Sequence, residues 1–501
     1  MKVLLLPLDE RPCNRVFPQM IAESNDEIEL VVPPLELLGN KKKPADVAGI
    51  SAFLTEQAAG CDAAVLSLDM LLYGGLIPSR LHHLERAELD ERLDAVRSLK
   101  RANPAMRVYA FQCIMRCPSY DSAEEEPDYY EDYGYALFRR KYLLDVRERT
   151  GELSADEERE LAAIEVPEEI LADYEHRRDL NCDMNIAVLD LIGEGAIDFL
   201  VIPQDDSAPF GYTAIAQKRV IAALKEWRLD DRVMIYPGAD EVAMSLLTRA
   251  WVENEGLCPS IWPFYASVLG PTIVPNYEDR PMFESLKSHV RVVGARFADV
   301  PSEADVILAI NAPGKVMQES FVAPEEVDLT YTSYRNLADF TQRIAEHLAR
   351  GRRVALCDSA FSNGGDRACI EQLDRLGVLS SLASYAGWNT NCNTLGTTLA
   401  QAIVGRPGQA ATRNLCYRVI EDVFYQAEVR PAVVDRDLPA MGLSYYDFGD
   451  RQADVEELIR GELQQRFDAL GLAQEHPVRI ESVYMPWRRM FEIGMEIELE
   501  A

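Results

Sequence analysis

Two adjacent carboxylates, Asp240 and Glu241, give the chain its clearest means of acid–base chemistry. They follow an apolar run at 233–236 that ends in Pro-Gly, and residues with helical spacing begin at Val242. The pattern predicts a strand, a turn and a helix, with the acid pair at the carboxyl end of the strand. Ligands bind at this end of strands in open α/β sheets and in barrels. An isolated Asp-Glu pair could equally have no role beyond stabilising the positive end of the helix dipole.

Polar side chains follow most of the other predicted strands in the same way. Because the carboxyl ends of parallel strands meet at one edge of a sheet, we expect these side chains to line one cleft, and roughly half of them to be helix caps or turn formers. The residues expected to bind substrate are Asp9, Arg11, Asp69, Tyr73, Arg116, Asn311, Asp358, Trp388 and Asn389. The residues expected to be catalytic are Asp205, Asp206, Asp240 and Glu241.

Carboxylates, amides, guanidinium groups and an indole together are typical of a sugar site. Glycosidic cleavage needs a carboxylic acid that protonates the leaving oxygen and a second group that stabilises the developing positive charge. A neighbouring carboxylate raises the pKa of its partner by like-charge repulsion, which keeps a proton available. All six histidines lie away from the predicted strand ends, which argues against a His-based metal centre or nucleophilic triad. Without a P-loop or GxGxxG motif, we expect no metal and no cofactor.

Apolar strands alternate with helical segments, which predicts a mainly parallel α/β fold. We expect a distorted TIM-like barrel, although about ten candidate strands exceed the eight of a simple barrel. The predicted parts are a catalytic core at 1–270, which contains a helical insertion at 122–194, a second α/β portion at 271–404 and a C-terminal α+β portion at 405–501. The acidic run at 124–126 is expected on the surface. A short apolar run at 290–293 is expected to form a strand.

Composition narrows the classes of partner. The chain has 501 residues, 48% of them hydrophobic, and a formal net charge of −32. Such an acidic surface repels phosphate backbones, so we expect no nucleic acid, no membrane surface and a neutral small-molecule substrate. No stretch of the sequence is apolar over a bilayer-spanning length, and the expected compartment is cytoplasmic. The ten cysteines are expected to be reduced and mostly buried. A homo-oligomer is compatible with this composition.

Two resemblances add to this interpretation. The segment from Gly238 to Val242 resembles the Gly-x-Asp-Glu-Val signature of family 20 β-N-acetylhexosaminidases. That resemblance implies that Asp240 orients the substrate's 2-acetamido group and that Glu241 is the general acid/base. The pair Asp205-Asp206 resembles the Asp-Asp pair of the O-GlcNAc-removing hydrolases. Over most of its length the chain resembles a bacterial family of unknown function, through the segments PLDERPCN, LDMLLYGGLIPSR, PQDDSAPFGYT, PGADE and GWNTNCNTLG.

Three functions remain open. The first is a retaining glycoside hydrolase that cleaves terminal N-acetylhexosaminides by substrate assistance. The second is a divalent-metal hydrolase or lyase that uses an aspartate cluster as hard oxygen ligands. Its ligands would be Asp9, Asp69, Asp205, Asp206 and Asp358. The third is a non-catalytic carbohydrate-binding protein with the same cleft.

Overall fold

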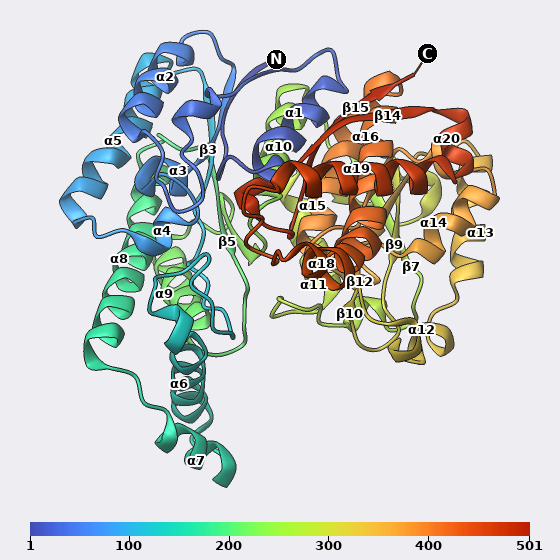
Figure 1. The fold of residues 1–501 in the computed structure, drawn as a ribbon. Coiled ribbons are helices and arrows are strands. Elements are labelled where there is room, and N and C mark those ends of the chain that lie inside the picture. The colour runs from blue at the N-terminus through green and yellow to red at the C-terminus, as the bar shows by residue number, and fades with distance from the viewer. Residues whose placement is uncertain (501) are drawn as a thin grey trace. The chain divides into compact units, whose positions relative to one another are not determined.

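Strands and helices alternate along the chain as predicted, and in the computed structural model the strands assemble into two main parallel sheets (Figure 1). The structure describes residues 1–500. One unit contains residues 1–10, 30–246 and 277–279, and the remaining described residues form the other. The boundary between Leu246 and Leu247 lies inside a helix, whereas the sequence analysis placed its first domain limit at residue 270.

The first unit is built on a six-stranded sheet with the order β2-β1-β3-β4-β5-β6. Its strands are β1 (Lys2–Leu6), β2 (Glu29–Val31), β3 (Ala63–Ser67), β4 (Arg107–Phe111), β5 (Phe199–Gln204) and β6 (Val233–Pro237). The pairs from β1 through β3, β4 and β5 to β6 are all parallel. The carboxyl ends of these strands therefore lie along one edge.

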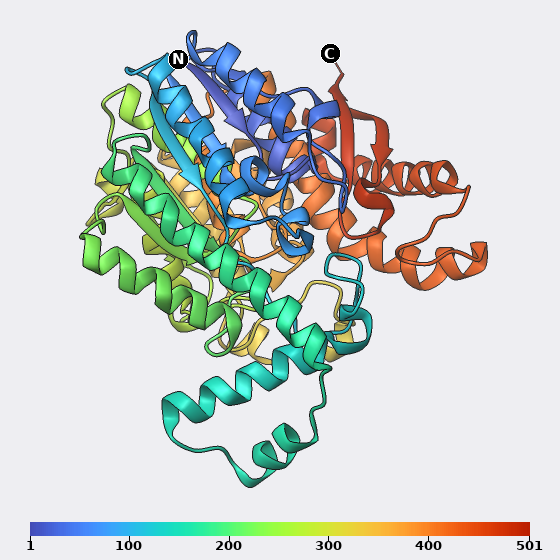
Figure 2. The ribbon, with the colours of Figure 1, turned by 90° about the vertical axis from the view of Figure 1, so that its left-hand side faces the viewer.

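Helices cover one face of this sheet (Figure 2). They are α2 (Val47–Ala58), α3 (Leu68–Tyr73), α4 (Pro78–Leu81), α5 (Arg86–Ala102), α8 (Glu168–Gly193) and α9 (Tyr212–Trp227), with a 3-10 turn η1 (Leu35–Leu37). The helix α10 (Val242–Asn254) follows β6 and contains the boundary between the two units. Alternate strand residues such as Leu4 and Leu66 enter one buried core with Leu54 of α2, Leu93 of α5 and Val188 of α8. The period-2 alternation of the strands and the apolar stripes of the helices account for this packing.

Three helices occupy the predicted insertion: α6 (Tyr130–Thr150), α7 (Ala155–Ala163) and α8. Figure 2 shows α7, in teal, projecting beyond the rest of this unit. The first turn of α7 has a capping box, in which Ser154 accepts from the Glu157 backbone N–H and Glu157 accepts from the Ser154 backbone N–H. The acidic run before these helices is only partly on the surface as expected, because Glu124 is 37% exposed whereas Glu126 is fully buried.

The second unit is built on a five-stranded sheet with the order β13-β11-β9-β7-β8, all in parallel. Its strands are β7 (Ser260–Tyr265), β8 (Arg296–Phe297), β9 (Val306–Asn311), β11 (Val354–Asp358) and β13 (Ser384–Ala386), and a separate small parallel pair is β10 (Gln318–Glu319) with β12 (Phe361–Ser362). The run at 290–293 is not a strand, because Val290 and Val292 belong to α11 (Met282–Val292). A short apolar run fits the buried face of a helix as well as a strand.

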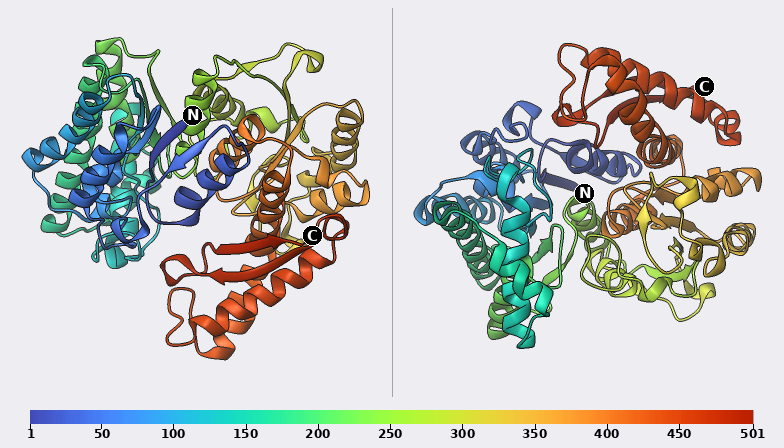
Figure 3. Two further views of the ribbon diagram at one scale, coloured as in Figure 1. Left: turned by 90° about the horizontal axis from the view of Figure 1, so that it is seen from above. Right: turned by 60° about the horizontal axis from the view of Figure 1, so that its bottom comes forward.

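Helices of the second unit include an unusually long π-helix. They are α1 (Pro12–Glu23), α11, α12 (Thr330–Ser333), α13 (Leu337–Ala349), α14 (Arg367–Arg375), α15 (Asn391–Val404), α16 (Gln409–Arg418), the π-helices η6 (Val419–Val429) and η7 (Val433–Asp437), α17 (Arg430–Ala432), α18 (Leu438–Met441), α19 (Gln452–Asp468) and α20 (Gly471–Glu475). The 3-10 turns are η2 (Gly270–Thr272), η3 (Pro301–Glu303), η4 (Pro324–Glu326), η5 (Leu379–Ser381) and η8 (Pro486–Arg488). The antiparallel hairpin of β14 (Val478–Tyr484) and β15 (Gly494–Leu499) lies alongside α19 (Figure 3). Runs of π-helix are rare and frequently occur at functional sites.

The predicted barrel is wrong, because neither main sheet closes among the described residues. In a barrel each strand is added on the same side of the one before it. Here β2 lies on one side of β1 and β3 on the other, so the winding direction reverses after the first two strands. The order β8-β7-β9 makes the same reversal in the second sheet. Such open α/β sheets bind ligands at the carboxyl ends of the strands, where the order reverses.

Within residues 1–500, no helix combines the length and the apolar character needed to cross a membrane. All ten cysteines are free thiols, and all except Cys258 are buried, as predicted.

Candidate functional site

Predicted acids of the first unit gather at the carboxyl edge of its sheet. Asp69 lies in the first turn of α3, directly after β3, and Asp205 and Asp240 follow β5 and β6. Their negative charges all act on the buried Cys113 thiol, whose pKa is raised well above its usual value by burial and then by these three charges. Carboxylates that are distant in the chain therefore lie within electrostatic range of one thiol at this edge.

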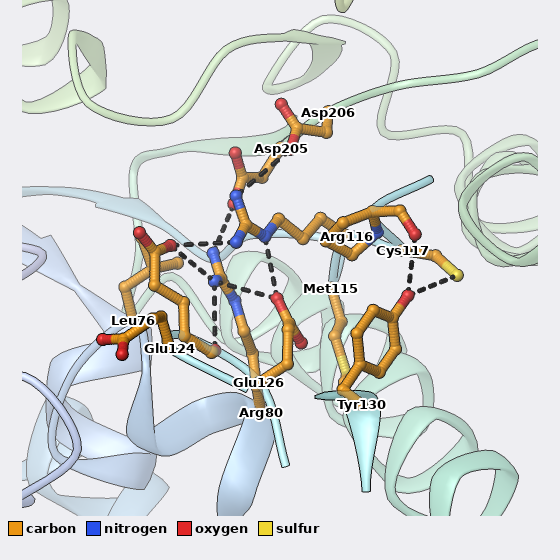
Figure 4. A network of polar contacts seen from close by, with 12 residues as sticks. Leu76, Arg80, Met115, Arg116, Cys117, Glu124, Glu126, Tyr130, Asp205 and Asp206 are labelled. Atoms are coloured by element: carbon orange, nitrogen blue, oxygen red, sulfur yellow. Dashed lines mark hydrogen bonds and ion pairs between the residues drawn. The ribbon is translucent and has the colours of Figure 1, made fainter. Parts of the chain in front are cut away.

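Arg80 is the cation at the centre of this edge (Figure 4). It lies on the short helix α4, and only 1% of its side chain is exposed. Its Nη2 is 2.6 Å from Asp205 Oδ2, and its Nη1 is 3.2 Å from both Glu125 Oε2 and Glu126 Oε1. One buried guanidinium thus holds three carboxylates, which keeps Asp205 in an ion pair.

Arg116, one of the predicted site residues, makes the matching set of contacts (Figure 4). Its Nε is 2.9 Å from Glu126 Oε1, its Nη2 is 2.9 Å from Glu125 Oε2, and its Nη1 is 3.2 Å from Asp206 Oδ2. Two arginines and four carboxylates therefore form one network. Because the four negative charges exceed the two positive ones, a proton on one carboxyl group lowers the repulsion among them.

Asp206 is the member of the network whose pKa is shifted toward protonation. Burial and the adjacent Asp205 charge raise its pKa to about 6. Its backbone has φ of 45°, in the left-handed region that aspartate tolerates better than most residues. The side chains remain accessible, at 18% exposed for Asp205 and 26% for Asp206. The two neighbouring acids thus differ in their cation partners, Arg80 for Asp205 and Arg116 for Asp206, and both can be reached from solvent.

Asp69 is a second carboxyl group that favours its proton. Burial raises its pKa to about 7, although Oδ2 accepts a 2.8 Å hydrogen bond from the Cys113 backbone N–H. Ser67 accepts from the Met70 N–H and starts α3, which positions Asp69 in its first turn. The nearby Tyr73 phenol is buried, and its oxygen accepts from Gln112 Nε2 at 3.4 Å.

This shift predicts a pH-dependent gain in stability for Asp69→Asn. Because the pKa in the folded state is above the unfolded value, folding favours the protonated form, and ionised Asp69 costs stability as the pH rises from about 4 through 7. We expect the variant to exceed the wild type in free energy of unfolding at pH 8, on the order of 1 to 4 kcal/mol, and to match it near pH 4. Urea unfolding at both pH values measures this. Equal destabilisation at both would mean that the variant disturbs a contact that does not depend on the charge of Asp69, such as the hydrogen bond from the Cys113 N–H.

The second predicted acid pair is more deeply buried. Asp240 is 6% exposed and Glu241 is 0% exposed. Glu241 Oε2 accepts from the Ala239 backbone N–H at 3.1 Å, so the carboxylate turns back onto its own loop. Gly238 has φ of 140°, and a Cβ there would lie 2.5 Å from Glu241 Oε1. The positive φ favours glycine at this position, and the glutamate carboxylate occupies the space beside it. Asp9, after β1, is also buried.

The second unit gathers Asn311 and Asp358 at the ends of β9 and β11. Asp358 accepts from Asn311 Nδ2 at 2.8 Å, from the Asp366 backbone N–H at 2.7 Å and from the Tyr385 hydroxyl at 3.1 Å. Burial and the Asp366 charge raise the pKa of Asp358 to about 7. Arg335 Nη1 donates to Asp366 Oδ2 at 2.6 Å and so compensates part of this charge. The group is buried and fully hydrogen-bonded, which suits a structural role.

Trp388 and Asn389 line a small hollow in the same unit. Its wall also contains Glu421 of the π-helix and Glu492. Burial, with the charges of Asp422 and Glu492, raises the pKa of Glu421 to about 8. The Trp388 indole is 5% exposed and packs edge-on against another aromatic ring, so its face is not open for a sugar as expected.

Arg11 lies beside this hollow. Its guanidinium is 4.6 Å from the centre of the Trp487 ring, and its Nη1 is 3.5 Å from Glu492 Oε2. The predicted site residues therefore fall into two groups by unit. The group in the first unit is Asp9, Asp69, Tyr73, Arg116, Asp205, Asp206, Asp240 and Glu241, and the group in the second is Arg11, Asn311, Asp358, Trp388 and Asn389.

Sequence reasoning missed several charged residues of both groups. Arg80 lies on a short helix rather than at a strand end. Glu126 lies in a loop whose acidic residues the sequence predicts to be exposed to solvent. Glu421 lies inside a helix far beyond the last parallel strand. The pattern of strand ends could not reveal these residues. In residues 1–500, no three His, Cys, Asp or Glu side chains are grouped to hold a metal ion.

Comparisons with known proteins give the family but no activity. A solved structure titled "Crystal structure of an uncharacterized protein from Actinobacillus succinogenes" is 12% identical, and the match covers 82% of this chain and 92% of that chain. Its TM-score is 0.16, which supports no argument about the fold. No curated protein matches the chain, and nothing supports the local similarity to hexosaminidases. The family model described as "Protein of unknown function (DUF4127)" matches residues 3–496, so the chain belongs to that family.

Proposed function

We propose that the protein is a retaining glycoside hydrolase that cleaves a terminal N-acetylhexosaminide by substrate assistance. Asp206 is the general acid, and Asp205 is the carboxylate that orients the 2-acetamido group. The observation that supports this is the contrast within the pair: Asp205 is 2.6 Å from Arg80, whereas the pKa of Asp206 is raised to about 6. A carboxyl group whose pKa is raised beside an ion-paired carboxylate is a usual arrangement for the general acid of a glycosidase.

In the proposed reaction Asp205 acts as the carboxylate and the protonated form of Asp206 acts as the acid. Ionised Asp205 accepts a hydrogen bond from the acetamido N–H, and the acetamido oxygen attacks the anomeric carbon. The glycosidic C–O bond breaks as Asp206 gives its proton to the leaving oxygen. Water then attacks the anomeric carbon of the oxazolinium ion, Asp206 takes the proton from that water, and the acetamido group is released. Two displacements at one carbon retain its configuration.

Asp240 and Glu241 are supporting residues in this proposal. Glu241 is fully buried and bonded to its own loop, so it reaches a substrate less easily than the half-buried Asp206. Asp240 contributes negative charge close to Cys113, at the same edge of the sheet. The net charge of −32 further favours an uncharged sugar over an anionic one.

Substrate selectivity tests the mechanism directly. We expect hydrolysis of an aryl N-acetylhexosaminide and none of the matched aryl hexoside with a 2-hydroxyl group, because only the former carries the nucleophile. Proton NMR of the first product should show the same anomer as the substrate. Equal hydrolysis of both substrates, or an inverted product, would contradict substrate assistance. Loss of activity on treatment with a chelator would favour the metal-dependent alternative, and comparison of gluco and galacto substrates identifies the sugar.

A further inference from the structure

A roomy cleft lies in the first unit, next to the helix that carries Arg80. Its volume is about 500 Å³, within the range of small-molecule sites. Pro78 and Leu81, on the helix α4, form part of its wall together with Pro44 and Leu84. These side chains make much of the lining apolar, so the cleft suits a ligand with an apolar body.

The floor of the cleft includes a stacked aromatic pair. The rings of Tyr73 and His82 have centroids 4.7 Å apart and an interplanar angle of 24°. His82 Nε2 is 2.8 Å from Asn181 Oδ1, and the Leu84 backbone N–H donates to His82 Nδ1 at 3.2 Å. Burial lowers the pKa of His82 to about 4, so the ring is neutral at pH 7. Because both ring nitrogens have partners, the imidazole offers a ligand its apolar surface rather than a charge.

Cations predominate among the charged groups of the lining. Lys42 and Arg92 line the cleft, and the one acid there, Asp46, accepts from the Gly49 backbone N–H as the cap of α2. The carboxylates that pair with these cations lie outside the lining and are accessible. Lys42 is 3.3 Å from Asp128, whose side chain is fully exposed.

Arg92 shows the same arrangement. Its Nη2 is 2.6 Å from Glu88, which is 47% exposed. Ion pairs with solvated carboxylates are worth little, so an anion inside the cleft can compete for these cations. A cationic rim is unusual in a chain with a net charge of −32.

We propose that this cleft binds a small organic anion, namely a carboxylate carried on an apolar, aromatic body. The apolar body packs on Leu81 and the stacked rings, and the carboxylate contacts Lys42 and Arg92 at the rim. The binding is independent of the proposed hydrolysis, because Asp205 and Asp206 are not in the lining.

Calorimetric titration of the full chain with benzoate tests the proposal. We expect saturable binding of benzoate at millimolar concentration and much weaker binding of benzyl alcohol, which has the ring without the charge. Lys42→Gln should weaken benzoate binding by about tenfold, the usual value of one charge-assisted hydrogen bond. Ala48→Phe should block binding, because Ala48 is an exposed residue of α2 that lines the cleft.

Matched variants separate this site from a general charge effect. Lys43→Gln removes a neighbouring exposed lysine outside the lining, and Ala52→Phe adds the same ring one turn further along α2. Both should bind benzoate as the wild type does. The proposal is overturned if benzoate does not bind, if benzyl alcohol binds equally well, or if each control variant weakens binding as much as its partner. If inorganic phosphate bound as tightly as benzoate, the apolar body would contribute nothing to the affinity, which would contradict the proposal.

Discussion

Asp206→Asn should lower kcat/KM for an aryl N-acetylhexosaminide by about 10²- to 10⁴-fold, the usual contribution of a general acid. The amide has nearly the same shape but no proton to give to the leaving oxygen. We expect a much smaller loss with a dinitrophenyl leaving group, which departs without protonation. Steady-state kinetics with both substrates measure the contrast. An equal loss with the two leaving groups would mean that Asp206 has another role.

The pH profile provides the second measurement for this residue. Asp206 must be protonated to act, and its pKa is raised to about 6, so kcat/KM of the wild type should fall as the pH rises above 6. This decline should be absent in Asp206→Asn. Asp231→Asn, a change at an exposed turn residue, is the matched control and should leave both the rate and the profile unchanged. If the decline persists in Asp206→Asn, it arises from the ionisation of another group.

Arg80→Met should lower the free energy of unfolding by about 3–5 kcal/mol, the usual cost of removing one partner of a buried ion pair. Methionine fills much of the space but leaves Glu126, which is fully buried, with Arg116 alone as its cation. Asp205 also loses its partner at 2.6 Å. Urea unfolding at pH 7, where these acids must be ionised in the unfolded chain, measures the loss.

An exposed arginine provides the control for this prediction. Arg86 pairs with Asp90 on the surface of α5, and the two side chains are 48% and 49% exposed. Arg86→Met should cost less than about 1 kcal/mol, because exposed pairs contribute little. Adding Glu126→Gln to Arg80→Met should recover part of the loss, since it removes the uncompensated charge. If the double variant is no more stable than Arg80→Met alone, the loss comes from packing rather than from charge.

Local pattern was sufficient to locate most strands and their polar ends. The apolar residues at 63–67 form β3 (Ala63–Ser67), and the run at 233–236 forms most of β6 (Val233–Pro237), as predicted. Asp205 and Asp206 follow β5 directly, as expected. These features depend on the spacing of hydrophobic residues over short segments, which is visible directly in the sequence.

The sequence by itself determined the α/β class, the positions of the strands and the acidic residues that follow them. Only the tertiary structure decided that β2 and β3 lie on opposite sides of β1, and hence that the first sheet is open. It also decided that Arg80 and Glu126 lie beside Asp205. The physical reason is range: strand order and ion pairing depend on contacts between residues far apart in the chain, and these contacts leave no periodic signal along it.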